Sequence, residues 1–248
     1  MPDEALKKLL EMLTQRYPRY GFWKLYPLVR NQGFNVNHKR LHRIYCENGF
    51  NLKRKLKKRL PKREKLQLVQ PNQLNETWSL DFMSDALVNT QRFRTVNILD
   101  DGNREALGIK VGHSLPARVV TQYLDSIACW RGYPKNLRVD NGPENISRVM
   151  FDWSKQHGVN LRFIEPGKSA QNAYIERFNR TYREEVLAMY LFKNVRDVQV
   201  ITDKWIREYN EQRPHQSLGN LTPCEFGYKR LGQSDDFLYE PVCTKMGC

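Results

Sequence analysis

Apolar positions in the first fifty residues recur at the three- and four-residue spacing of amphipathic helices. The first run ends before Pro18, and the second covers residues 22–32 and stops at Gly33. The third follows Asn37, a residue that can cap a helix, and ends at Gly49. The pattern therefore predicts a small all-helical unit at the start of the chain.

From Asn75 onward the pattern becomes that of strands. Between Glu76 and Ser84 apolar and polar residues alternate, so that one face of the expected strand is apolar and the other carries Asp81. Further strands are expected over 93–99, 106–111, 137–140 and 161–164, with helices over 116–130, 147–157, 172–192 and 195–210. Three strands in series, followed by alternating helices and strands, predict a mixed α/β sheet rather than a doubly wound parallel one.

The charge balance points to a polyanionic partner. The 248 residues include 41 Lys and Arg against 27 Asp and Glu, a formal net charge of +14. Such an excess attracts nucleic acid, although a merely basic protein is the plain alternative. The densest block is expected to be a linker that follows a DNA backbone, the alternative being a tether with no binding role. Its basic residues include Lys53, Arg54, Lys55, Lys57, Lys58 and Arg59.

The third expected helix carries a basic outer face formed by Lys39, Arg40 and Arg43. Short helices, a glycine-containing turn and a basic last helix are typical of a helix-turn-helix that reads DNA. A solvated charged face on a small bundle is the alternative.

Cysteine spacing and hydropathy argue against several classes of protein. The five cysteines form no CxxC pair, which argues against a zinc module and against a disulfide framework. No long uncharged apolar run suggests a membrane span. We therefore expect a protein of the cytoplasm, at the nucleoid in a bacterium, with no membrane partner.

Three acidic residues stand where a metal site could form. Asp81 lies mid-strand, where an isolated carboxylate is costly to desolvate unless it is paired or binds a metal. Asp140 ends a strand just before a tight turn, and Glu176 lies early in the helix expected over 172–192. Together they could hold two Mg²⁺ ions about 3.5–4 Å apart, as phosphoryl transfer requires. Taken singly, each acid has a structural alternative: a salt bridge, a cap or a turn.

The roles expected for other charged residues depend on where they lie relative to these three acids. Arg180 and Arg183 share the helix face of Glu176 and would lie along a DNA backbone. Asp85, Asp100 and Asp101 lie near strand ends and are interpreted as structural.

The spacing and the surrounding motifs resemble a known family. Between Asp140 and Glu176 lie 176 − 140 − 1 = 35 residues. The motifs are WSLDF (78–82), RVDNGPE (138–144), GKSAQNAYIERFN (167–179) and YNEQRPHQSL (209–218). They resemble the DD(35)E transposases and retroviral integrases, and above all the second-reading-frame product of bacterial insertion sequences. One departure is Asn145, at a position that is usually apolar in that family.

The resemblance implies a fold, a reaction and partners. The fold would be RNase H-like, a mixed five-stranded sheet with flanking helices, preceded by a small all-α helix-turn-helix domain. The reaction would be transfer of a DNA 3′-hydroxyl to a phosphodiester, with two Mg²⁺ or Mn²⁺ ions held by Asp81, Asp140 and Glu176. Members act as multimers on the ends of their element, often as a frameshift fusion with an upstream reading frame.

The same analogy makes Lys168, Gln171 and Asn172 candidates for contacting DNA beside the metals, with Lys168 as an ordinary loop lysine the alternative. The expected domains are 1–52 (helix-turn-helix), 53–71 (basic linker), 72–232 (catalytic core) and 233–248 (tail). Two other functions remain open: a non-catalytic DNA-binding regulator of transposition, and an RNase H-type nuclease acting on RNA in hybrids.

Overall fold

The computed structural model describes residues 3–52, 71, 73–165 and 169–231. The chain divides into two compact units, one formed by residues 1–64 and 213–222 and the other by residues 65–212 and 223–248. Residues 213–222, which the sequence analysis assigns to the catalytic core, thus group with the N-terminal helices. The basic block 53–70 and the tail 233–248 lie outside the described residues.

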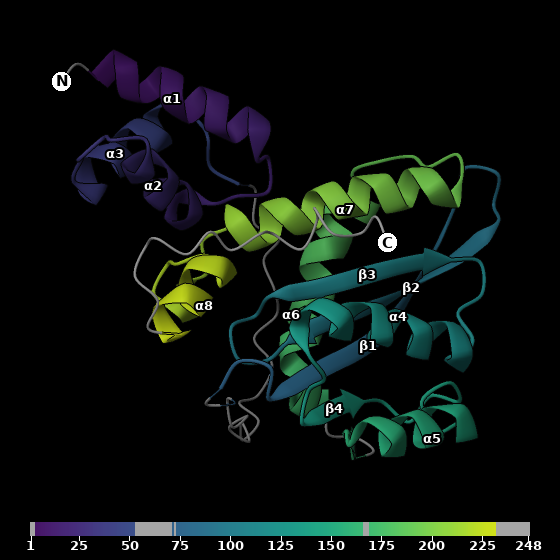
Figure 1. Cartoon of the computed structure of the whole chain (residues 1–248). Coiled ribbons are helices and arrows are strands. Elements are labelled where there is room, and N and C mark those ends of the chain that lie inside the picture. Colours follow the sequence, from purple (N-terminus) through teal and green to yellow (C-terminus); the bar gives the residue numbers. More distant parts are fainter. Residues whose placement is uncertain (1–2, 53–70, 72, 166–168, 232–248) are drawn as a thin grey trace. The chain divides into compact units, whose positions relative to one another are not determined.

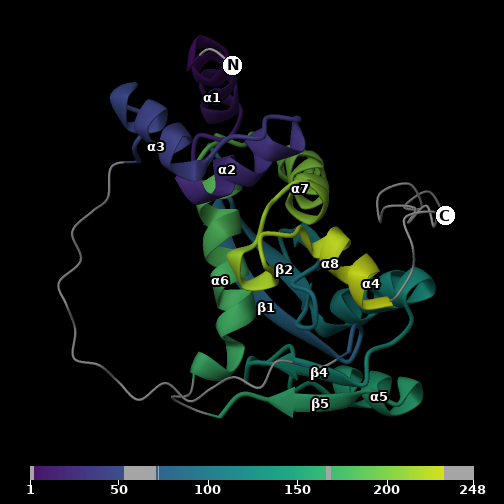
Figure 2. The same ribbon diagram turned by 90° about the vertical axis from the view of Figure 1, so that its left-hand side faces the viewer.

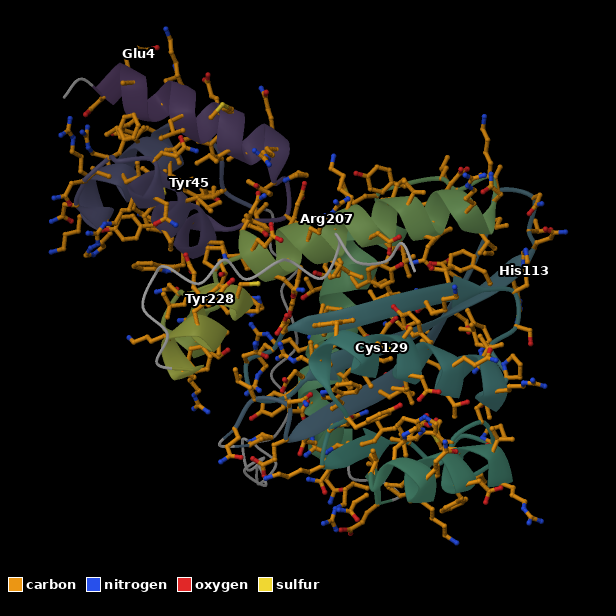
Figure 3. All side chains as sticks on the ribbon, in the orientation of Figure 1. Glu4, Tyr45, His113, Cys129, Arg207 and Tyr228 are labelled. Carbon is orange, nitrogen blue, oxygen red and sulfur yellow. The ribbon has the colours of Figure 1, made fainter. Side chains whose placement is uncertain are left out.

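The N-terminal unit is built on three helices, α1 (Asp3–Arg16), α2 (Phe22–Asn31) and α3 (His38–Glu47). Their positions confirm the predicted helices, and the Asn37 side chain accepts a hydrogen bond from the backbone N–H of Lys39 as the expected N-cap. Tyr45 lies inside this bundle, with its ring 5.6 Å from that of Phe22 (Figure 3). The core is the predicted apolar stripes: Leu6, Leu9, Leu10, Leu13, Leu25, Val29, Leu41 and Ile44.

The segment 213–222 joins this unit through Arg213. The Arg213 side chain is buried, and its guanidinium lies over the ring of Tyr20 at 4.9 Å from the centroid. A single bridge between His215 and Leu221 closes the segment around the short 3₁₀ turn η3 (Gln216–Leu218). A chain segment distant in sequence therefore completes the helical unit.

The second unit contains one sheet of five strands (Figure 1). The strands are β1 (Thr77–Ala86), β2 (Arg92–Asp100), β3 (Ala106–Gly112), β4 (Asn136–Val139) and β5 (Asn160–Phe163), in the order β3-β2-β1-β4-β5. Pairs β1–β2 and β2–β3 are antiparallel, and pairs β1–β4 and β4–β5 are parallel. The expected mixed five-stranded sheet is thus confirmed, with β1 at its centre.

Helices cover both faces of the sheet. Helices α4 (Ala117–Arg131) and α5 (Arg148–His157) pack on the face that carries Trp78 and Leu80. Helices α6 (Ala173–Tyr182) and α7 (Val195–Glu211) pack on the opposite face, against Met83. Figure 2 shows α4 and α6 on opposite sides of the strands. The alternation predicted for β1 therefore separates two cores. Among the described helices, none is both long and apolar enough to span a bilayer.

The prediction of a single helix over residues 172–192 is wrong. The chain there forms the 3₁₀ turn η1 (Ser169–Asn172), then α6, and then one π-helical turn, η2 (Arg183–Leu187). A π turn advances the helix by less than 100° per residue, so the 3.6-residue stripe no longer holds beyond it. Met189, which would continue the apolar stripe of an unbroken helix, is 42% exposed. Helix α8 (Pro223–Leu231) was not predicted, although Pro at a first helical position is a common start.

Buried ion pairs fix the end of β2. Arg131 of α4 lies 3.0 Å from Asp100 and 2.9 Å from Glu105, and both carboxylates are almost fully buried. Arg138 of β4 pairs with Asp101, which also accepts a 2.8 Å hydrogen bond from the Ser79 hydroxyl. Asp100 and Asp101 are thus structural, as predicted.

Candidate active site

Asp81 and Asp140 come from the two adjacent central strands. Asp81 lies mid-strand in β1 and is half-buried, and Asp140 follows the last residue of β4. In the parallel pairing of these strands Ser79 lies opposite Arg138. Asp81 and Asp140 each lie two residues beyond this pair, Asp140 just past the end of β4, and the Asp140 charge acts on Asp81.

Glu176 approaches from helix α6. It lies in the first turn of that helix, and its side chain is exposed. Asn179, one turn later, is buried, and its Nδ2 donates a 2.7 Å hydrogen bond to Oδ2 of Asp81. The turn of α6 that carries Glu176 is therefore linked directly to Asp81.

The charges of Asp140 and Glu176 act on Asp81. Burial, the largest effect, raises the pKa of Asp81, the two neighbouring carboxylates act in the same direction, and the resulting pKa is about 6. Hydrogen bonds from the Phe82 N–H and from Asn179 act in the opposite direction. Carboxylates that lie close together in a partly buried site repel one another, and a bound cation reduces that repulsion. This cluster therefore favours binding of a positively charged species.

The Asp140 carboxylate is held by the turn that follows it. Its Oδ1 accepts a 3.0 Å bond from the Gly142 N–H and a 2.7 Å bond from Nδ2 of Asn145. Asn145 is fully buried and packs beneath Asp140 as a hydrogen-bond donor. This is the position at which the family usually has an apolar residue. Both donors address one oxygen, which leaves Oδ2 without a hydrogen bond from the turn.

Replacing Gly142 by Ala should lower the rate of the reaction without unfolding the protein. A Cβ at this position would stand 3.0 Å from Oδ1 of Asp140, closer than such contacts normally are, so the carboxylate must shift. A misplacement of about 1 Å can cost on the order of 100-fold, and this shift is a few tenths of an ångström. We therefore expect a roughly two- to tenfold lower rate of the DNA joining that the resemblance implies, with little change in melting temperature. Single-turnover kinetics and a thermal melt measure both. A wild-type rate would show that the carboxylate tolerates the shift.

An ion pair pins the same turn to the sheet. Glu144 pairs with Arg94 of β2, whose guanidinium lies 4.7 Å from the ring centroid of Phe82. Burial, the largest single effect, raises the pKa of Glu144, but the hydrogen bond from Arg94, a backbone hydrogen bond and the Arg94 charge together lower it below its ordinary value. Glu144 thus stays ionised and contributes to the negative field beside Asp140.

The carboxylates suit a hard divalent cation. Among the residues that the structure describes, no three His, Cys, Asp or Glu side chains stand close enough to hold one ion. Yet the donors are all carboxylate oxygens, which Mg²⁺ and Mn²⁺ prefer, and the Glu176 side chain is exposed. The donor chemistry of the three residues therefore fits such an ion.

The polar residues expected to contact DNA near the carboxylates differ in their surroundings. Arg180 is exposed, whereas Arg183 lies 3.6 Å from Asp85 and 3.4 Å from the carbonyl oxygen of Ser84. Gln171 exchanges two hydrogen bonds with Glu165.

Asn172 is buried, and its Oδ1 has no partner in the described part of the chain. Contact between Asn172 and DNA stays a prediction. Lys168 lies outside the described residues.

The three basic residues expected to read DNA lie on the outer face of α3, and two of them have an acidic partner. Oδ1 of Asp3 accepts from Arg40 at 2.9 Å, and Oδ2 accepts from Arg43 at 2.8 Å. Lys39 is exposed. Because exposed ion pairs are weak, phosphates can displace Asp3, and contact with DNA by all three residues stays a prediction. The residues predicted in the linker, from Lys53 to Arg59, lie outside the described part.

Sequence reasoning missed the asparagines around the aspartates. Asn97 lies opposite Asp81 in the β1–β2 register, is fully buried, and donates to Asn179 at 2.6 Å. The one available signal was an amide residue in the middle of an apolar strand run, where a polar group needs a partner.

Three family models match the chain. The "HTH-like domain" matches residues 2–58, and two models of the "Integrase core domain" match residues 71–169 and 157–223. The two core matches contain Asp81, Asp140 and Glu176.

Similar proteins come from bacterial insertion elements. The chain is 40% identical over 233 residues to the insertion element IS407 31.7 kDa protein of Burkholderia multivorans, covering 94% of this chain and 84% of that protein. It is 39% identical to the IS476 39.2 kDa protein of Xanthomonas euvesicatoria, covering 90% of this chain and only 64% of that protein. It is 24% identical to the putative transposase InsK of IS150 from Escherichia coli, covering 90% and 82% of the two chains.

Solved structures show the same fold at low identity. A chain of the simian T-cell lymphotropic virus intasome, solved with a PP2A regulatory subunit, gives a TM-score of 0.57 at 12% identity, covering 78% of this chain and 68% of that one. The catalytic core domain of BIV integrase gives 0.50 at 16% identity, covering 64% and 97%. The sheet and its helices thus have the integrase-core arrangement.

Proposed function

The chain belongs to the family of insertion-sequence transposases that combine an HTH-like domain with an integrase core, and we propose that it cleaves and joins DNA strands at the ends of its element. The observation that carries this proposal is the grouping of Asp81, Asp140 and Glu176. Two come from adjacent central strands and the third from a helix hydrogen-bonded to the first, and their charges interact.

In this reaction a DNA 3′-hydroxyl oxygen forms a new bond to phosphorus, and the bond to the departing 3′-oxygen breaks. Asp81, Asp140 and Glu176 would hold two Mg²⁺ or Mn²⁺ ions, which supply the charge that activates the hydroxyl and stabilises the leaving oxygen. The chain's own contribution is orientation. The Asn145 and Gly142 donors fix Asp140, and Asn179 fixes Asp81. Arg180, exposed on the Glu176 helix, would contact the DNA phosphates.

DNA and further protein chains would complete the assembly. The helical unit would bind the element ends through α3. Because two ends must be joined to one target, we propose that the protein acts as a multimer on DNA. The Xanthomonas relative is longer than this chain, which agrees with an additional segment supplied by an upstream reading frame.

Strand joining in vitro tests the function. Purified protein is mixed with a labelled duplex of the element end bearing a free 3′-hydroxyl, in Mg²⁺ or Mn²⁺, beside a Glu176→Gln variant. We expect joined products with the wild type, none in EDTA, and at least about a 1,000-fold lower rate with the variant, since loss of a metal ligand removes charge stabilisation worth several kcal/mol.

DNA binding without joining, equal in both proteins, would contradict catalysis by this chain and favour a regulator. Repeating the assay with a fusion to an upstream reading frame then shows whether a preceding segment enables joining.

A further inference from the structure

We propose that Asn97, a buried residue of β2 outside the carboxylate triad, is a positioning residue for strand joining. Through Asn179 it fixes the orientation of Asp81 and the placement of the α6 turn that carries Glu176. The inference rests on the proposed function, because it assigns a role within the same site.

The position of Asn97 is unusual for an amide. It is fully buried between Val96 and Ile98 in an internal strand, and it lies opposite Asp81 in the strand pairing. A buried amide without hydrogen bonds costs roughly 1–3 kcal/mol by mutational measures, so a partner is required.

Asn97 finds that partner in the α6 helix. Its Nδ2 donates to Oδ1 of Asn179 at 2.6 Å and lies 3.1 Å from the sulfur of Met83. Asn179 in turn donates from Nδ2 to Oδ2 of Asp81 at 2.7 Å. The three residues therefore form a hydrogen-bonded chain from β2 through α6 to β1.

The direction of this chain is set by the carboxylate. An ionised Asp81 can only accept, so Asn179 must turn its amide nitrogen toward it. The Asn179 oxygen then faces away and needs a donor, which Asn97 supplies. Asn97 thus holds Asn179 in the one orientation that serves Asp81, and a reversed Asn179 would place an oxygen against the carboxylate.

The same contact sets the α6 helix. Asn179 is one turn beyond Glu176, and a helix is rigid over that distance. Fixing Asn179 against both β2 and β1 therefore fixes the backbone from which Glu176 reaches the two aspartates. The same pair of hydrogen bonds therefore positions both Asp81 and Glu176.

The cost of keeping Asn97 argues for function rather than stability. Its Oδ1 is buried and has no hydrogen-bond partner within the described residues. An apolar residue would avoid that penalty and pack equally well in a strand. Polar groups retained at such cost occur mainly where orientation matters.

The test compares two substitutions on one strand. Asn97→Val removes the donor to Asn179. Thr95→Val, two residues away, likewise removes a buried polar group, a hydroxyl with no hydrogen-bond partner in the described part of the chain, but it leaves the chain of hydrogen bonds intact. Three quantities are measured for each: Mn²⁺ affinity of the DNA-free protein by calorimetry, hydrogen exchange over residues 173–182, and single-turnover joining. Should Val overpack the site, Asn97→Ala serves in its place.

We expect Asn97→Val to fold, to bind Mn²⁺ about tenfold more weakly, to exchange faster in α6, and to join DNA roughly 10- to 100-fold more slowly with unchanged DNA affinity. Thr95→Val should match the wild type in all three measurements. Wild-type Mn²⁺ affinity and α6 exchange in Asn97→Val would overturn the inference. Failure of the wild type to join DNA would instead contradict the proposed function, while the affinity and exchange comparisons still decide the role of Asn97.

Discussion

Replacing Asp81 by Asn should abolish DNA joining, by about 1,000-fold or more, while leaving the metal-free protein at least as stable as the wild type. The activity falls because a charged ligand is lost from the centre of the site. The stability is retained because Asp81 ionises in a partly buried place beside Asp140 and Glu176, which is what raises its pKa to about 6. Removing that charge should raise the free energy of unfolding at pH 7 by up to about 3 kcal/mol, since the pKa rises from 3.8 to about 6.

Thermal melts with and without Mn²⁺ measure this second effect. The wild type should gain melting temperature on adding Mn²⁺, since a ligand bound only to the folded state stabilises it, and the variant should gain much less. Asp203→Asn is the matched control. Its carboxyl on α7 also has a pKa raised by burial and accepts from Gln199, yet it lies apart from the triad. A variant of Asp81 that joins DNA normally, or whose Mn²⁺ response equals that of the wild type, would remove Asp81 from the metal site.

The sequence predicted those parts of the fold that depend on local pattern. The alternation from Glu76 to Ser84 placed Trp78 and Asp81 on opposite faces of β1, as found, because a strand has a two-residue period. The helix capped by Asn37 also formed as expected, since a side chain that accepts a hydrogen bond from the first turn acts locally.

Features that depend on tertiary contacts escaped prediction. The π turn after Tyr182 inserts one residue per turn, which a search at 3.6-residue spacing cannot register. The sequence suggests that Arg213 is a charged loop residue. Its side chain is nevertheless buried beside Tyr20, a residue nearly two hundred positions earlier in the chain. The roles of Asn97 and Asn145 depend on their hydrogen bonds around Asp81 and Asp140. No residue spacing in the sequence predicts those contacts.

The strongest effect on stability is expected from Arg131→Met. This substitution leaves Asp100 and Glu105, which are almost fully buried, without the cation that lies 3.0 and 2.9 Å away. Removing one partner from a buried ion pair costs roughly 3–5 kcal/mol, because the remaining charge is uncompensated. Urea unfolding measures the loss. Arg148→Met is the control: its pair with Asp152 is 3.6 Å long, the Arg148 side chain is 92% exposed, and we expect a change below about 0.5 kcal/mol.

The pH dependence of this loss distinguishes an unpaired charge from a packing defect. Burial already raises the pKa of Asp100, and Arg131 opposes that effect. Without Arg131 the folded-state pKa rises further, so the folded protein binds a proton more tightly than the unfolded chain. Stability then falls as pH rises above the ordinary Asp value of about 4, and the deficit is largest at neutral pH. Adding Asp100→Asn should restore part of the loss at pH 7, whereas a deficit equal at all pH values would mean that Arg131 acts through packing.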